Sequence, residues 1–411
     1  MRLSRRFKYI FRILIWGCLG LYVSLWTLLN LPYVQGKLAS LASGALRQVL
    51  NTEVSVGRVN IGLLNRIIIE DVLLNDQQGE EMLKVSRLAA RFELEPLLDG
   101  KISINNVQLF GLSAQLKRDN PQAIPNFQFV LDALASKDTL KKETNLDLRI
   151  NSVLIRKGQI AYNVLSEPET PGKFNPSHMG INDLSASISL KALKNDSLHA
   201  IVRRLSFEEQ SGFGLKKLSL RTIANNNKLN LNDFELELSN TTLSLDSVEV
   251  RYDSLSSLPK MMDDVVYQGK LKADLYPTDF APFLPLLKGL DQPMNLALEF
   301  KGKGKDLECP VISLLDKDHL RLNAEAMVFN WGAGRDIFLD SKLNTFHVTP
   351  EGIQYFMNNL TGSVPSILQQ LGFVRLQAQL GGYLREMKFD GQIRTGAGVL
   401  DADMFINSDE A

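Results

Sequence analysis

Apolar and polar residues alternate with a period of two along most of the chain after residue 52. The clearest stretch is 215–252, in which Asn and Asp residues favour tight turns between the alternating runs. Alternation places successive side chains on opposite faces of a strand, so this stretch predicts an antiparallel meander with one apolar and one polar face. Ten residues are expected to line the apolar face: Leu218, Leu220, Leu229, Leu231, Leu236, Leu238, Leu243, Leu245, Val248 and Val250.

The same alternation recurs elsewhere, and a few segments interrupt it. The further alternating stretches are 54–61, 67–74, 88–94, 102–116, 146–162, 184–190, 296–300 and 320–329. Residues 125–135, 279–290 and 350–371 are expected to be helical instead, the last with a break at 362–365. Segments 271–329 and 343–406 follow the same order of strand, helix, Gly-rich strand and hairpin, which indicates a repeat. The pattern predicts a mainly β fold, an elongated antiparallel repeating β-groove with a few short helices.

An almost uninterrupted apolar run occupies residues 13–31 and would span about 28 Å as a helix, enough to cross a bilayer. A basic tail, residues 1–12, precedes it, so the positive-inside rule predicts a cytoplasmic N-terminus. Its cations are Arg2, Arg5, Arg6, Lys8 and Arg12. A cleaved signal peptide is the alternative, but its apolar part is usually only about 7 to 15 residues long. We therefore expect a single-pass anchor with the rest of the chain outside the cytoplasm.

Residues 32–51 have apolar positions at helical spacing and predict an amphipathic helix that caps the β structure of residues 52–411. Lys and Arg total 46, as do Asp and Glu, which gives no electrostatic reason to expect a nucleic-acid partner. The two cysteines, Cys18 and Cys309, cannot form a disulfide framework. The fold is therefore expected to depend on packing and strand pairing.

Signals of catalysis are weak. The histidines lie at scattered positions without ligand spacing, and neither cysteine has a histidine nearby, so no catalytic residue, metal site or cofactor is predicted. The histidines are His178, His199, His319 and His347. The sequence KGKGKD at 301–306 lacks the spacing of a phosphate-binding loop, and Gly396 and Gly398 are typical of a turn. Four aspartates precede Ser or Thr and an apolar residue, which resembles a bacterial O-glycosylation acceptor: Asp138, Asp196, Asp246 and Asp253.

Three segments carry a likeness to known proteins. Residues 55–76, SVGRVNIGLLNRIIIEDVLLND, and residues 94–111, LEPLLDGKISINNVQLFG, resemble the N-terminal repeat of AsmA-like proteins. Residues 371–404 are similar to part of the TamB-like translocation and assembly module proteins. The resemblance implies a taco-shaped β-groove that extends from the bacterial inner membrane into the periplasm. It also implies phospholipid as a partner and, for TamB-like proteins, support of outer-membrane β-barrel assembly and protein secretion.

The resemblance is to the N-terminal portion of TamB-like proteins, because their C-terminal domain is not recognised before Ala411. The chain is expected to be part of a longer protein or a shorter AsmA-type member. Alternating strands commonly pack face to face as a dry sandwich core; the anchor, the repeat and the resemblance favour a lipid groove instead. The expected function is phospholipid transport toward the outer membrane, envelope assembly, or both. The alternative is a non-conducting periplasmic scaffold.

Overall fold

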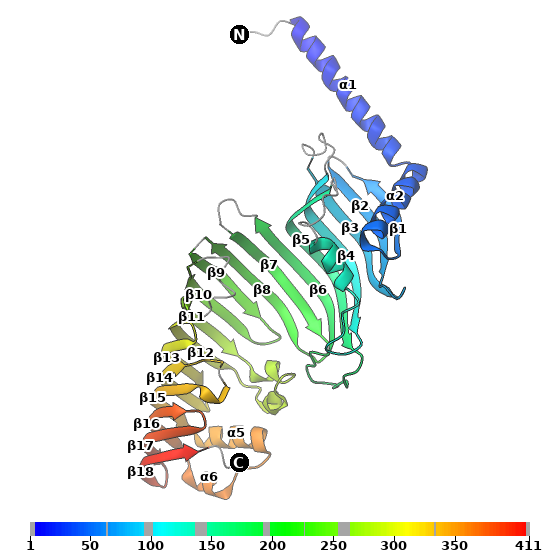
Figure 1. Ribbon diagram of the computed structural model, residues 1–411. Coiled ribbons are helices and arrows are strands. Elements are labelled where there is room, and N and C mark those ends of the chain that lie inside the picture. The colour runs from blue at the N-terminus through cyan, green and yellow to red at the C-terminus, as the bar shows by residue number, and fades with distance from the viewer. Residues whose placement is uncertain are drawn as a thin grey trace. The chain divides into compact units, whose positions relative to one another are not determined.

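The computed structural model describes residues 5–62, 65–93, 102–135, 146–191, 198–225, 227–253, 264–332 and 334–407. Within this part, eighteen strands belong to one sheet and helices are few, so the protein is mainly β, as the alternation predicts (Figure 1). The chain divides into two compact units. Unit 1 comprises Met1–Glu169 and Asn175–Ser187, and unit 2 comprises Thr170–Phe174 and Ile188–Ala411.

Two helices precede the strands of unit 1. Helix α1 (Arg5–Leu29) contains Phe11–Leu29, a segment that is long and apolar enough to cross a membrane and is not buried against the described protein. Helix α2 (Pro32–Leu50) is the amphipathic helix expected there. Proline at its first turn suits a helix start, and Asn51 ends it with a left-handed φ of 50°.

The strands of unit 1 are β1 (Val54–Ile61), β2 (Arg66–Asn75), β3 (Glu81–Phe92), β4 (Ile102–Arg118), β5 (Leu146–Val164) and the first part of β6 (His178–Lys191). Strands β1 to β4 pair in sequence order and antiparallel. Strands β4 and β5 are parallel, so the predicted antiparallel sheet contains a parallel pair here. The connection between them contains helix α4 (Gln128–Ala135) and is long enough to return the chain to the same end of the sheet.

Helix α2 covers the apolar side of the first strands. Val54, Val56 and Leu74 are at most 8% exposed and pack in one cluster with Ala39 of α2. Partly buried side chains from α2, β2, β3 and the segment around α4 complete this cluster. The first strands of unit 1 therefore have a dry core under α2, as expected of a capping helix.

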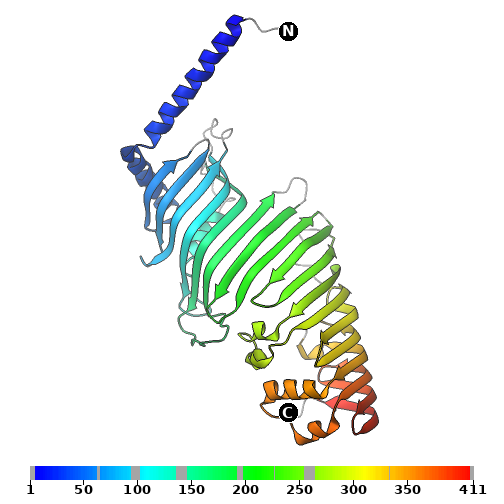
Figure 2. The ribbon, with the colours of Figure 1, turned by 180° about the vertical axis from the view of Figure 1, so that it is seen from behind.

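The strands of unit 2 that follow β6 are β7 (Leu198–Glu209), β8 (Gly214–Ala224), β9 (Lys228–Glu237), β10 (Thr242–Arg251), β11 (Val266–Leu275), β12 (Met294–Lys303), β13 (Asp306–Asp316), β14 (Leu320–Phe329), β15 (Phe338–Val348), β16 (Val374–Tyr383), β17 (Glu386–Thr395) and β18 (Gly398–Asn407). From β7 onward each strand pairs antiparallel with the next (Figure 2). This is the antiparallel meander that the sequence predicts.

Helical segments interrupt unit 2 in two connections. Helices α5 (Pro350–Thr361) and α6 (Ser366–Leu371) confirm the prediction for 350–371, with Gly362 ending α5 at a φ of 76°. The prediction of one helix over 279–290 is wrong, because the segment forms two 3-10 helices, η2 (Pro277–Phe280) and η3 (Pro285–Gly289). Pro282 and Pro285 each lack the N–H that a continuous helix needs at those positions.

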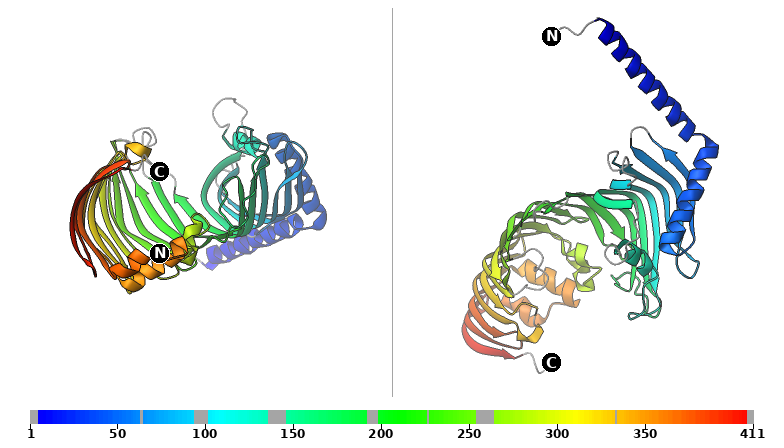
Figure 3. Two further views of the ribbon diagram at one scale, coloured as in Figure 1. Left: turned by 90° about the horizontal axis from the view of Figure 1, so that it is seen from below. Right: turned by 45° about the horizontal axis from the view of Figure 1, so that its top comes forward.

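The two predicted repeats have the same element order. The first consists of β11, the η2–η3 segment and β12 to β14; the second consists of β15, the α5–α6 segment and β16 to β18. A further 3-10 helix, η4 (Gly334–Asp336), connects them. Figure 3 shows the sheet of unit 2 curving, with α5 and α6 on the inner side of the curve. The second repeat thus keeps the strand plan of the first but has longer helices.

Candidate functional site

One face of the unit 2 sheet is apolar from β7 to β18, and we call it the apolar face. The strand register aligns one apolar residue from each of these strands in a single line, the apolar row: Leu205, Leu218, Leu236, Leu243, Ala273, Leu296, Leu314, Leu322, Phe346, Leu376, Ile393 and Leu400. A second line runs parallel to it, through Phe234, Leu245, Leu271 and Leu298. An uninterrupted apolar strip therefore crosses the strands.

The apolar row is not a dry core. Its only buried member is Ala273, whereas its leucines are half-buried and Leu400 on the last strand is 57% exposed. Among the described residues, no second sheet packs over this face. A leucine in a sandwich core is almost fully buried, as Val54 is under α2 at 2% exposure. The sandwich alternative therefore does not describe the apolar face of unit 2.

The ten residues predicted to line the groove come from β8, β9, β10 and the turn after β9. The register places nine of them on the apolar face, and these nine are half-buried. Leu238 differs: it lies just beyond β9, is 3% exposed and donates its backbone N–H to Thr241 in the turn. Leu238 therefore supports the turn and does not line an open surface, because the alternation ends where the strand ends.

Groove residues were named from the sequence only within 215–252, and the register adds residues from β11 to β18, where a repeating groove was expected without named residues. The contributing residues include Leu271, Leu298, Ile312, Leu343 and Phe389. A signal was present in the alternating stretches 296–300 and 320–329. It was weaker because small residues such as Ala273, Ala324 and Ala378 occupy apolar-face positions, and these alanines are buried.

The opposite face of the unit 2 sheet, which we call the charged face, carries cross-strand ion pairs. Lys217 Nζ lies 2.5 Å from Glu235, and Lys270 Nζ lies 2.6 Å from Glu299. Further pairs join Lys228 to Glu249, Lys301 to Glu308 and Lys388 to Asp403. The hydrogen bond from Lys217 lowers the pKa of Glu235, and the same bond raises the pKa of Lys217. Such exposed pairs add little stability, but they keep this face hydrated.

Two shallow hollows lie mostly among residues of the charged face, although residues of the apolar row, including Leu236 and Leu243, also contribute to the larger one. One, of about 610 Å³, lies over β9 to β13 and includes Glu235, Lys272 and Asp274. The other, of about 370 Å³, includes Lys301 and Asp306. Charged side chains line both hollows, and Met327 and Phe329 add apolar surface to the smaller one. Because the apolar row continues through every strand from β7 to β18, whereas each hollow involves only a few neighbouring strands, we place the candidate site on the apolar face.

A polar cluster fixes helix α5 at the rim of the sheet. Asp316, 4% exposed, accepts a hydrogen bond of 2.9 Å from His319 Nδ1, and the His319 ring stacks on Tyr355 of α5 at 4.4 Å. The Tyr355 hydroxyl lies 3.3 Å from Asp291 and accepts the N–H of Gln292. Burial raises the pKa of Tyr355. The cluster holds no nucleophile in reach of a base, so its geometry indicates a structural contact.

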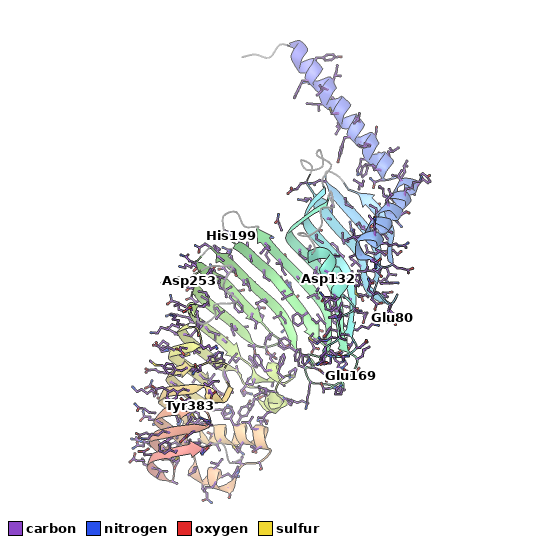
Figure 4. All side chains as sticks on the ribbon, viewed as in Figure 1. Glu80, Asp132, Glu169, His199, Asp253 and Tyr383 are labelled. Carbon is purple, nitrogen blue, oxygen red and sulfur yellow. The ribbon has the colours of Figure 1, made fainter. Side chains whose placement is uncertain are left out.

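The other singled-out residues are separated from one another. His199 lies at the start of β7, at the rim where Asp253 follows β10 (Figure 4). His178 is 3.0 Å from the side-chain oxygen of Asn163, and Cys309 is buried. No group of three or more His, Cys, Asp or Glu side chains among the described residues is placed to hold a metal.

The glycine-containing segments and the acceptor-like aspartates also have local explanations. KGKGKD forms the turn between β12 and β13, with a φ of 59° at Gly304, and Gly396 lies in the turn before β18. Asp246 is exposed in β10, whereas Asp138 and Asp196 lie outside the described residues. These turns agree with the structural interpretation of both glycine segments.

The fold and its two faces define a class: a mainly β protein with a candidate membrane-spanning helix and a sheet that is apolar on one side and charged on the other. No protein-family model matches this chain, and neither a curated protein nor a solved structure is significantly similar to it. The likeness to AsmA-like and TamB-like proteins stays a prediction from the sequence.

Proposed function

We propose that the protein is anchored in the bacterial inner membrane by α1 and that its apolar face binds the acyl chains of phospholipid in the periplasm. Bound lipid moves along this face toward the outer membrane. The observation that carries the proposal is the apolar row, a half-exposed strip over which no second sheet packs among the described residues.

The physical reason lies in the cost of exposing lipid to water. Each methylene group exposed costs about 0.8 kcal/mol, so two sixteen-carbon chains cost on the order of 25 kcal/mol. An apolar strip that repeats from strand to strand at about 4.8 Å removes most of this barrier and offers equivalent positions in series. The headgroup stays in water, so no polar pocket is required. Movement along the row then needs no catalytic residue and no cofactor.

The location is supported by α1 and by the charges around it. The unburied apolar segment Phe11–Leu29 follows four cations and contains a fifth, Arg12, at its start, which favours a cytoplasmic N-terminus and a periplasmic sheet. The resemblance to AsmA-like and TamB-like proteins points the same way and adds an outer-membrane β-barrel assembly partner. A non-conducting scaffold is the second candidate, and the experiment below distinguishes it from a lipid conduit.

A photo-crosslinking amino acid at Leu236 or Leu245 should capture phospholipid, because both side chains lie on the apolar face. The matched controls are Glu237 and Ser244, neighbours on the same two strands whose side chains lie on the charged face. Lipid attachment is read by mass spectrometry of the full-length protein after irradiation in cells. Equal capture at all four positions, or capture at none, would leave the scaffold.

Leu236→Glu provides an independent arm of this test. Because Leu236 is half-buried, the new carboxylate reaches water and the fold persists, while acyl chains meet a desolvation penalty of several kcal/mol. We expect unchanged circular dichroism and loss of lipid capture at Leu245. Unfolding of this variant would instead indicate a dry core at this position.

A further inference from the structure

Helix α2 is covered by the sheet along one side only. Ala39 and Ser43 are buried there, whereas Tyr33, Leu41 and Val49 are 73%, 70% and 61% exposed. A surface helix of a water-soluble protein normally carries polar residues on the side that faces away from its core. The exposed side chains of α2 therefore require another explanation.

The exposed residues form a pattern with the charges of the helix. Leu41, Ala45 and Val49 follow one another at intervals of four and lie on one flank. The charged residues of α2 are Lys37 and Arg47, without any Asp or Glu. Lys37 Nζ lies 5.2 Å from the centre of the Tyr33 ring. An apolar flank combined with cations and an aromatic ring is typical of helices that lie in the headgroup region of a membrane.

The connection to α1 places α2 close to the membrane surface. Helix α2 begins at Pro32 and α1 ends at Leu29, so the gap spans roughly 10 Å at most. Trp26 Nε1 and Asn30 Nδ2 donate hydrogen bonds of 3.1 and 3.0 Å to the carbonyl oxygen of Ile61, which fixes the end of α1 against β1. Figures 1 and 3 show α2 turning away from the direction of α1. If α1 crosses a bilayer, α2 therefore begins next to the bilayer surface and turns away from the direction of crossing.

We propose that α2 is an interfacial helix whose exposed side lies in the headgroup region of the bilayer that α1 crosses. Leu41 and Val49 enter the acyl boundary, Lys37 binds anionic phospholipid headgroups, and Arg47, whose Nε donates a hydrogen bond of 3.0 Å to the carbonyl oxygen of Val54, adds positive charge at the same surface. The opposite side of α2 still caps the first strands of the sheet. The proposal rests on membrane anchoring by α1 and adds that the sheet begins directly at the bilayer surface.

The test uses the full-length protein in lipid nanodiscs containing about one third phosphatidylglycerol in phosphatidylcholine. In a background without Cys18 and Cys309, a single spin label is placed at position 41, 49, 40 or 19. Ser40 is exposed on the other flank of α2 and serves as the matched control, and Leu19 reports on α1. For each label, the ratio of its accessibility to oxygen to its accessibility to a water-soluble nickel complex is measured. This ratio should be at least threefold higher at positions 41 and 49 than at position 40.

Equal ratios at positions 40, 41 and 49, with position 19 embedded, would overturn the interfacial helix and leave the anchor intact. A water-accessible label at position 19 would overturn the anchor and this proposal with it. The charge component is tested by Lys37→Gln with Arg47→Gln, and by discs without phosphatidylglycerol. Both changes should lower the ratio at position 41; an unchanged ratio in both would overturn anionic headgroup binding.

Discussion

At the scale of single residues, Asp279 shows how a buried charge shapes the rim of the sheet. Its carboxylate, 8% exposed, accepts the backbone N–H of Asn240 at 2.8 Å and of Thr241 at 2.6 Å, and so holds the turn between β9 and β10. Burial works to raise the pKa of Asp279, but the hydrogen bonds from Asn240 and Thr241 outweigh it, so this pKa lies below its ordinary value. The ionised form is therefore stabilised by folding.

Asp279→Asn should lower the free energy of unfolding by about 2 kcal/mol at pH 7, the usual contribution of hydrogen bonds to a charged group. Because the pKa is depressed in the folded protein, this stability is present above the unfolded pKa of about 3.9 and is lost as the pH falls through the folded value. The difference between wild type and variant should thus shrink below about pH 4. Denaturant unfolding, followed by circular dichroism at several pH values, measures it.

The control is Asp340→Asn, an exposed position on the charged face, where the change should stay within about 0.5 kcal/mol. If Asp279→Asn had the same effect at pH 7 and pH 3, the ionised carboxylate would not be the source of the stability. Turn residues of this kind are hard to predict, because the partners Asn240 and Asp279 are far apart in the sequence.

At the scale of elements, a series of β-bulges shifts the alternation in successive strands. Residues with positive φ lie inside strands at Asp71, Lys157, Asp183, Asp233 and Ser247, and Gly111 adds another with a φ of 62°. In the β9–β10 pair, Leu245 faces Phe234, and the next apolar pair is Val248 with Leu231, so each strand has one extra residue. Bulges increase the local twist and bend of a sheet. The bulges keep the apolar residues on one face of the sheet, although the spacing between successive apolar residues changes there from two positions to three.

Gly111 allows a measurement at one of these positive-φ positions, where β4 passes close to Ser86 of β3. A Cβ atom at this position would lie 2.6 Å from Ser86 Oγ, and a left-handed alanine costs about 1–2 kcal/mol by itself. Gly111→Ala should therefore lower the free energy of unfolding by more than Gly79→Ala, which also has a positive φ but an open surrounding. Adding Ser86→Ala to the Gly111→Ala variant should recover part of the additional loss of unfolding free energy, because it removes the Ser86 hydroxyl oxygen from the contact. Identical losses of unfolding free energy in Gly111→Ala and Gly79→Ala would mean that the close approach of position 111 to Ser86 has no energetic cost.

Much of this element plan could be predicted from the sequence. The expected strands 54–61 and 320–329 agree with β1 and β14, and the break in 350–371 agrees with Gly362. The bulges were not predicted, although the change of spacing between Leu231 and Phe234 was a signal. The parallel β4–β5 pair was also missed, because periodicity gives the faces of a strand and not its direction. Strand β3 was placed too late, since Ala89, Ala90 and charged residues blur its alternation.

The candidate site was predictable in part for a related reason. Alternation assigns Leu229, Leu236 and Leu243 to one face, and the register agrees. Whether such a face is a dry core or an open surface depends on what covers it. That is a property of distant segments: α2 covers the first strands of unit 1, whereas no described helix or sheet makes the leucines of the apolar row fully buried.

At the scale of the whole molecule, a balanced total charge conceals a strong division of polarity. Lys and Arg equal Asp and Glu in number, yet in unit 2 the ion pairs gather on one face of the sheet and the leucines on the other. The charged face gives solubility without net attraction to a polyanion. The apolar face is the surface to which we propose that lipid binds. This division suits the proposed function, in which the sheet stays in water while α1, the candidate membrane-spanning helix, anchors it.

The orientation of that attachment gives the last prediction. Five cations precede the apolar run that begins at Ile13, and Lys37 is the first cation after it. The positive-inside rule therefore predicts that a reporter fused after Gly36 is active only outside the cytoplasm. Replacing Arg5, Arg6, Lys8 and Arg12 by Gln should weaken this orientation and raise the cytoplasmic fraction of a paired fluorescent reporter. Lys37→Gln with Arg47→Gln is the matched control and should leave the orientation unchanged.

The N-terminal sequence of the mature protein is determined in the same samples, since a start near Ser43 would replace the anchor by a cleaved signal peptide. Cytoplasmic activity of the unmodified fusion would overturn the proposed location of the sheet.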